Sequence, residues 1–99
     1  MNKFEIRYLP LAESQLISLR DDPSKKGIFK SVYKTLTFMG VNIKHPSLNT
    51  HKYNAMKGPK GEEIFESYAQ NNTPGAYRIF WYYGPGKSVI TILAITPHP

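Results

Sequence analysis

The chain has 99 residues, which is the size of one domain with one modest core, so we expect a single domain over residues 1–99. Hydrophobic residues make up 40% of the chain, aromatic residues make up 13%, and there is no cysteine. This composition excludes a disordered chain and any disulfide or thiolate site, and it fits a reducing, cytoplasmic location. No signal peptide is expected at the amino terminus, and the longest apolar run, residues 89–95, is too short to cross a membrane.

The basic residues are distributed unevenly along the chain. The net charge is +6, but residues 1–60 contain eleven Lys or Arg and four Asp or Glu, whereas residues 61–99 contain two and three. A basic surface of this kind attracts polyanions such as RNA and speeds their association. A helix face that is charged only for solubility has the same composition, so charge alone leaves both interpretations open.

The first forty residues predict a strand followed by two helices. Apolar and charged residues alternate over residues 3–8, which is the period of a strand. Pro10 suits the first turn of a helix. Asp22 and Pro23 then predict the N-cap and first position of a second helix, which we expect to end at Gly40. The two helices should pack as an antiparallel hairpin.

The remainder of the chain predicts strands. Residues 41–60 carry turn-forming residues and are expected to be an irregular loop. Residues 64–69, 77–83 and 88–95 are rich in β-branched and aromatic residues, and the short connections between them favour antiparallel pairing. The expected order is β-α-α-β-β-β. This is an α+β domain with a helical hairpin packed on one face of a small, mainly antiparallel sheet.

The strand over residues 77–83 has two different faces. Ile79, Trp81 and Tyr83 share one of them, and the other carries Arg78, Phe80 and Tyr82. We assign the Trp81 face to the core beneath the helices, because an arginine pointing into a small core would need a buried partner. Arg78 is therefore expected to point outward, away from the helices.

Four segments, in this order and spacing, span nearly the whole chain: FEIRYLPLAESQLISL, HPSLNTHKYNAMKG, AYRIFWYY and ITILAITPHP, the last with a histidine just past the final strand. Together they resemble the RelE/ParE superfamily of toxins from toxin–antitoxin systems. The resemblance implies a ribosome-dependent mRNA endonuclease, or mRNA interferase, neutralised by a cognate antitoxin. Such enzymes cut when an RNA 2′-hydroxyl attacks the adjacent phosphate. They need a base, an acid and a cation but no metal or other cofactor.

The resemblance also indicates four catalytic candidates. Arg78 matches the family's strand arginine and would clamp the scissile phosphate, although it could instead pair with Glu66 on the neighbouring strand. His98 matches a catalytic position after the last strand, but it could equally be part of a loose terminus. Glu66 and Tyr68 stand where active members commonly have basic residues. In one interpretation Glu66 is the general base and Tyr68 donates a hydrogen bond or stacks on a base; in the other, Glu62, Glu63 and Glu66 repel RNA at this strand.

Several further residues are candidates for holding RNA. Solubility alone also explains any single lysine among them, and an aromatic residue on a strand often belongs to the core. The candidates are Lys44, Lys52, Lys57, Lys60 and Tyr82. His45 and His51 are alternative acid–base residues, and their spacing does not define a metal site.

Two other functions remain open from the sequence alone. The ParE branch of the superfamily inhibits DNA gyrase by binding it. A catalytically inactive, basic member would only bind RNA or a partner protein, with salt-sensitive affinity and no product. Arg78 and His98 favour cleavage, whereas Glu66 and Tyr68 weaken that interpretation.

Overall fold

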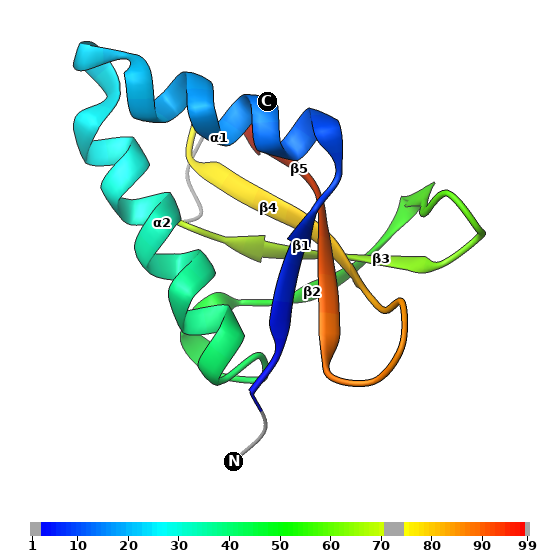
Figure 1. Ribbon diagram of the computed structural model, residues 1–99. Helices are drawn as coiled ribbons and strands as arrows, with labels where there is room; N and C mark the ends of the chain where they lie inside the picture. The colour runs from blue at the N-terminus through cyan, green and yellow to red at the C-terminus, as the bar shows by residue number, and fades with distance from the viewer. Residues whose placement is uncertain (1–2, 71–74, 99) are drawn as a thin grey trace.

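The sheet of the computed structural model, which describes residues 3–70 and 75–98, has five strands in the order β1-β5-β4-β3-β2 (Figure 1). Their bounds are β1 Glu5–Tyr8, β2 His51–Lys57, β3 Glu63–Tyr68, β4 Tyr77–Tyr83 and β5 Val89–Pro97. β1 runs parallel to β5, and the other pairs are antiparallel. The expected α+β class and mainly antiparallel sheet are confirmed.

Two helices cover one face of this sheet, α1 Pro10–Asp21 and α2 Lys26–Val41 (Figure 1). Pro10 occupies the first turn of α1, as expected. Asp22 does act as an N-cap, since its Oδ1 accepts hydrogen bonds from the Ser24 backbone N–H at 2.9 Å and from its hydroxyl at 2.7 Å. The capped element is a 3₁₀ turn, Pro23–Lys25, so α2 begins three residues later than predicted. These bonds from Ser24 also lower the pKa of Asp22.

Gly40 does not end α2, which continues to Val41, so that part of the prediction is wrong. The Phe4 backbone N–H donates to the Gly40 carbonyl at 2.8 Å. A Cβ at Gly40 would lie 3.4 Å from both the Phe4 carbonyl oxygen and Ile6 Cδ1. This residue therefore lets the segment at β1 approach the helix closely, which is a tertiary requirement that a helix-end pattern does not reveal.

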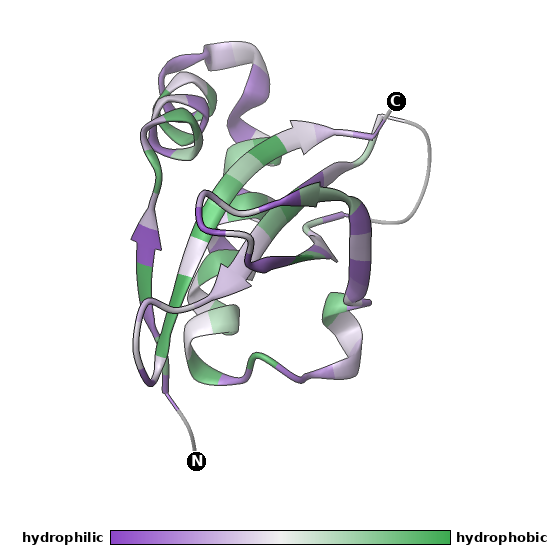
Figure 2. Ribbon diagram, turned by 90° about the vertical axis from the view of Figure 1, so that its right-hand side faces the viewer, coloured by the Kyte–Doolittle hydropathy of each residue, from purple (hydrophilic) through white to green (hydrophobic). Residues whose placement is uncertain are grey.

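The main core lies between the helices and the sheet. Trp81 and Ile79 of β4 are almost fully buried there against Leu36 and Met39 of α2, which confirms that the Trp81 face is the core face. The Trp81 indole N–H donates to the buried Ser67 hydroxyl at 2.9 Å, so the polar atom of this large side chain is satisfied. Figure 2 shows the apolar residues concentrated along the central strands. Each large side chain buried here contributes roughly 1.5–3 kcal/mol.

The expectation of an irregular loop over residues 41–60 is wrong, because the segment contains β2 and a short 3₁₀ turn, Pro46–Leu48. The pairing of β2 with β3 shifts register between Tyr53 and Lys57. The two half-buried residues of β2, Tyr53 and Met56, are consequently three positions apart, yet both pack on the same apolar cluster. A search for strict alternation misses such a strand.

A second, smaller apolar cluster lies on the sheet face opposite the helices, which we call the outward face. Its buried members are Ile64, Phe80, Tyr82 and Ala94, and Tyr53, Met56, Leu9 and Leu93 pack around them. The side chains of Tyr53 and Met56 from the edge strand β2 therefore cover part of the outward face, which is not fully open to solvent. Within the described residues, no helix is long and apolar enough to cross a membrane.

Candidate active site

The four catalytic candidates come together on the outward face, at the end of β3. Glu66 and Tyr68 belong to β3 and Arg78 belongs to β4, and the strand register sets Tyr68 directly opposite Arg78. His98 follows β5, whose Thr96 lies opposite Arg78 on the other side. Residues from three separate segments therefore form one group, which we call the outward cluster: Glu66, Tyr68, Arg78 and His98.

An ion pair holds the middle of the outward cluster. Arg78 Nη1 donates to Glu66 Oε2, and the two side chains are only 11% and 9% exposed. The guanidinium carbon also lies 4.9 Å from the centre of the Phe80 ring and 5.9 Å from that of Tyr53. Among the described residues, Arg78 Nε is buried without a hydrogen-bond partner. The pair is thus enclosed by aromatic rings, where losing one partner would leave an uncompensated charge.

Arg78 points outward as predicted, but its side chain is largely buried. Arg78 lies on the face opposite Trp81, as proposed from the alternation of β4. Tyr53 of β2 covers this part of the face and contacts the Phe80 ring at 4.8 Å between centroids. The pairing of Arg78 with Glu66, which the sequence left open, is the arrangement found. Because β2 was not predicted, the sequence did not indicate that Tyr53 packs over Arg78 and Phe80.

Tyr68 is arranged as a hydrogen-bond donor. Its hydroxyl donates to Glu66 Oε1 at 3.4 Å. Burial raises the pKa of Tyr68, and the neighbouring Glu66 carboxylate raises it further, while Arg78 opposes the shift. The phenol is therefore held in its protonated form and is suited to donate to a phosphate or to Glu66 but not to act as a base.

His98 is fastened to the sheet by its backbone. Its N–H donates to the Ala76 carbonyl at 2.7 Å, and its carbonyl accepts from the Gly75 N–H at 3.0 Å. Its ring lies 6.3 Å from the Tyr68 ring, with an angle of 25° between the ring planes. The imidazole is consequently positioned beside Tyr68, within the outward cluster. These two backbone hydrogen bonds distinguish His98 from a residue in a loose terminus.

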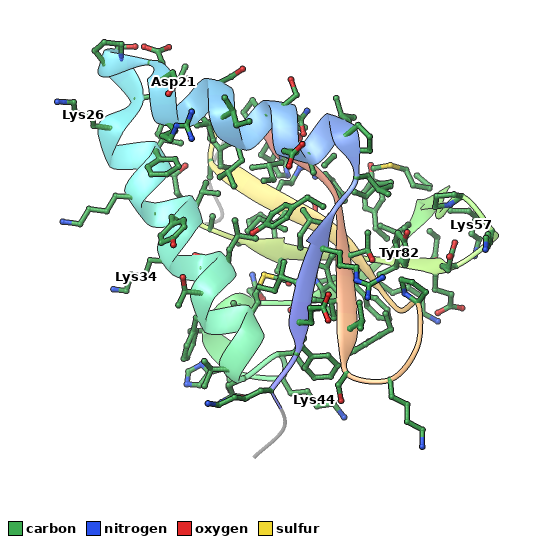
Figure 3. All side chains as sticks on the ribbon, in the orientation of Figure 1. Asp21, Lys26, Lys34, Lys44, Lys57 and Tyr82 are labelled. Atoms are coloured by element: carbon green, nitrogen blue, oxygen red, sulfur yellow. The ribbon has the colours of Figure 1, made fainter. Side chains whose placement is uncertain are left out.

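The lysines predicted to hold RNA do not form one surface patch. Lys52 of β2 pairs with Glu63 at 3.0 Å, and this contact lowers the pKa of Glu63. Lys57 ends β2, whereas Lys44 follows α2, and the two side chains lie on separate parts of the molecule (Figure 3). Lys60 lies in the turn between β2 and β3. Because this segment is a strand and a turn, its lysines are spread along its length.

Tyr82 was predicted as an RNA-stacking residue, and its burial contradicts that role. It is 5% exposed and belongs to the second apolar cluster, so neither ring face is open to a base. Tyr53 and His51 take positions over the outward face that the sequence did not assign. His51 lies opposite Glu66 in the register of β2 and β3. Only recognition of β2 as a strand could have placed them there.

The described residues contain no group of three His, Asp or Glu side chains arranged to hold a metal ion. The outward cluster provides one guanidinium, one carboxylate, one phenol and one imidazole. Together these groups can bind an anion, donate hydrogen bonds and move protons.

Comparison with solved structures identifies the class of fold that carries this site. The chain is similar to RelE in the archaeal RelE–RelB complex from Pyrococcus horikoshii OT3, with a TM-score of 0.65, 14% identity, and coverage of 96% of this chain and 94% of that one. It is also similar to the YoeB/ParE toxin from Agrobacterium tumefaciens, with a TM-score of 0.67, 4% identity, and coverage of 97% and 100%. The part of the chain that the structure describes has the RelE/ParE-like toxin fold.

The likeness extends to a third toxin structure. The YoeB dimer from Staphylococcus aureus matches with a TM-score of 0.62 and 14% identity, covering 98% of this chain and 99% of that one. No protein-family model and no curated protein matches the sequence. The fold predicted from the resemblance is thus found in solved structures that share only 4–14% of their sequence with this chain.

Proposed function

We propose that this protein is the cytoplasmic toxin of a toxin–antitoxin pair and that it cleaves mRNA on the ribosome as an endoribonuclease. The observation that carries the proposal is the meeting of Glu66, Tyr68, Arg78 and His98 on one sheet face. These four side chains provide the cation, the hydrogen-bond donor and the proton-transfer groups that RNA cleavage through the 2′-hydroxyl requires. The fold shared with RelE and YoeB supports the same class.

The proposed reaction is a transesterification. The RNA 2′-oxygen bonds to the adjacent phosphorus and its proton passes to a base, while the bond from phosphorus to the 5′-oxygen breaks and that oxygen takes a proton from an acid. The products are a 2′,3′-cyclic phosphate and a 5′-hydroxyl end. Arg78 stabilises the charge that develops on the phosphate oxygens, and Tyr68 donates a further hydrogen bond to them.

Substrate binding and release of the base are coupled in this proposal. Both carboxylate oxygens of Glu66 are engaged in the free protein, one by Arg78 and one by Tyr68. A scissile phosphate competes with Glu66 for Arg78, because both offer two oxygens to the planar guanidinium. Glu66 is then free to accept the 2′-hydroxyl proton, and His98 supplies the proton for the leaving oxygen. In this proposal the phosphate reaches Arg78, whose side chain is 11% exposed, beside the Tyr53 ring.

The proposed partners are a cognate antitoxin, the ribosome and mRNA. RelE from Pyrococcus horikoshii was solved in complex with RelB. The net charge of +6, concentrated in the first 60 residues, suits binding to an acidic antitoxin segment and to RNA.

The test is induced expression in a bacterium with mapping of mRNA 5′ ends. Wild type should arrest growth and create new mRNA ends, and Arg78→Lys, which keeps the charge but removes the fork, should lose them at equal soluble protein. Lys87→Gln, in the exposed turn before β5, is the matched control and should behave as wild type. Arrest without cuts would favour a gyrase-type target, and no arrest would favour an inactive binding protein.

A further inference from the structure

A second site lies beside the outward cluster, in a cavity of about 520 Å³ between α2, the Pro46–Leu48 turn and the end of β3. This volume is within the range of pockets that hold small molecules. The polar residues of its lining are Ser31, Lys34, Thr35, His45, Ser47, Tyr68 and Gln70, and Phe38, Leu48 and Ala69 complete it. Among the described residues, the lining has one lysine and no carboxylate, so its charge favours an anion.

The hydrogen bonds of two lining residues show which of their atoms accept and which can donate to a ligand. His45 Nδ1 accepts from the Ser47 backbone N–H at 3.1 Å, so the neutral ring carries its proton on Nε2. Gln70 Oε1 accepts from the Tyr77 N–H at 2.8 Å, which leaves the Gln70 amide nitrogen as the group it offers. Together with the exposed Lys34 ammonium, the lining supplies an imidazole N–H, an amide NH₂ and a cation.

The cavity also has an aromatic wall. The Phe38 and His45 rings lie 4.7 Å apart between centroids, and both residues line the cavity. A nucleobase can stack on such rings while a phosphate takes the donors, whereas an inorganic anion would use the donors alone. The combination of donors, cation and rings therefore matches a nucleotide better than a simple ion.

Tyr68 connects the cavity to the outward cluster. Tyr68 is one of the residues that line the cavity, and its hydroxyl donates to Glu66 of the outward cluster. We propose that this cavity binds the nucleotide next to the cleaved bond, with Lys34 and His45 holding its phosphate. The inference rests on the proposed function, since it takes RNA as the substrate, and it adds a binding subsite to that site.

The test measures binding of an uncleavable 2′-O-methyl RNA trinucleotide as a function of salt concentration. Lys34→Gln should weaken binding several-fold and reduce the slope of log affinity against log salt by roughly 0.7, the value for one phosphate contact on single-stranded RNA. Lys26→Gln removes the same charge from the same helix, outside the cavity, and should leave the slope unchanged (Figure 3). His45→Gln should weaken binding with a smaller change in slope.

The outcomes separate this inference from the proposed function. Arg78→Lys should abolish cleavage but keep the dependence of trinucleotide binding on Lys34. Equal effects of Lys34→Gln and Lys26→Gln would overturn the subsite while leaving cleavage at Arg78 intact. Binding of inorganic phosphate as tight as that of the trinucleotide would also overturn it. Loss of antitoxin binding in Lys34→Gln, with RNA binding unchanged, would assign the cavity to the protein partner instead.

Discussion

The two faces of the sheet bury different kinds of side chains, although the same strands form both. The face beneath the helices is built from close-packed apolar side chains, and the buried polar atoms of Trp81 and Ser67 satisfy one another. The outward face places a charged pair, Arg78 and Glu66, among aromatic rings and leaves Arg78 Nε without a partner among the described residues. Close packing of apolar side chains with satisfied polar atoms, as on the helix-side face, stabilises the fold. Burying the Arg78–Glu66 pair on the outward face costs free energy, and such a departure from the most stable arrangement is typical of functional sites.

The largest expected effect concerns the helix-side face. Trp81→Ala should lower the free energy of unfolding by about 3–5 kcal/mol, because it removes the largest buried side chain and leaves a cavity. Urea unfolding followed by circular dichroism measures the change. Tyr33→Ala, at a position that is 57% exposed, is the control and should change stability far less. Equal losses in the two variants would mean that the core is not where the structure puts it.

The next prediction tests the buried pair on the outward face. Arg78→Ala should lower the free energy of unfolding by roughly 3–5 kcal/mol, because Glu66 is left buried and unpaired. The double variant Arg78→Met/Glu66→Leu should recover most of that stability, because an apolar pair of similar volume needs no compensation. Both variants should lose cleavage.

Urea unfolding of the two variants gives the comparison. A double variant as unstable as Arg78→Ala would show that the pair stabilises the protein in its own right. Both faces of the sheet would then be arranged for stability. If recovery is seen without cleavage, the charges are retained for chemistry and not for folding.

The sequence predicted the two faces of β4 but not the environment of the outward one. Alternation along residues 77–83 was sufficient to separate Trp81 from Arg78, since side chains of a strand point to opposite faces. The helices and three of the last four strands could be predicted from periodicity in the same way. The cover over Arg78 could not be foreseen, because β2 contains a register shift that sets Tyr53 and Met56 three positions apart.

The candidate site shows the same division. Glu66, Tyr68, Arg78 and His98 were each proposed from position along the chain, and the strand register brings them together. Burial was the missing quantity, and it removed Tyr82 from the RNA surface. The resemblance predicted which residues lie near one another. It did not predict which of them are exposed to a ligand.

A sharper test of the outward cluster separates its proton donors. His98→Gln should lower cleavage by about 10²-fold and alter the pH–rate profile, because a glutamine amide cannot give a proton to the leaving oxygen. Stability should change little, since His98 is anchored by backbone bonds that glutamine also makes. The measurement is the pH dependence of cleavage of a ribosome-bound message. A profile identical to wild type would remove His98 from the mechanism.

Tyr68→Phe should have a smaller effect of a different kind. Its raised pKa keeps the phenol protonated through the neutral range, so it contributes a hydrogen bond and no titration. Cleavage should fall on the order of 10-fold, as expected for one hydrogen bond to a charged group, while both limbs of the pH–rate profile stay in place. The same pH series that tests His98 measures this. A shifted limb in Tyr68→Phe would mean that the phenol itself transfers a proton.

The smallest expected effect lies at the exposed edge of the sheet, where Lys52 pairs with Glu63. The Lys52 hydrogen bond lowers the pKa of Glu63, so any stabilisation is present above the unfolded pKa and is lost as the pH falls through the folded value. Lys52→Gln should raise the Glu63 pKa toward its usual range in a carboxylate NMR titration and leave urea stability unchanged within error. An unaltered Glu63 titration would mean that the pair is not formed in solution. Arg78 would then be held in a buried ion pair, whereas Lys52 would be an unpaired cation at the exposed edge of the sheet.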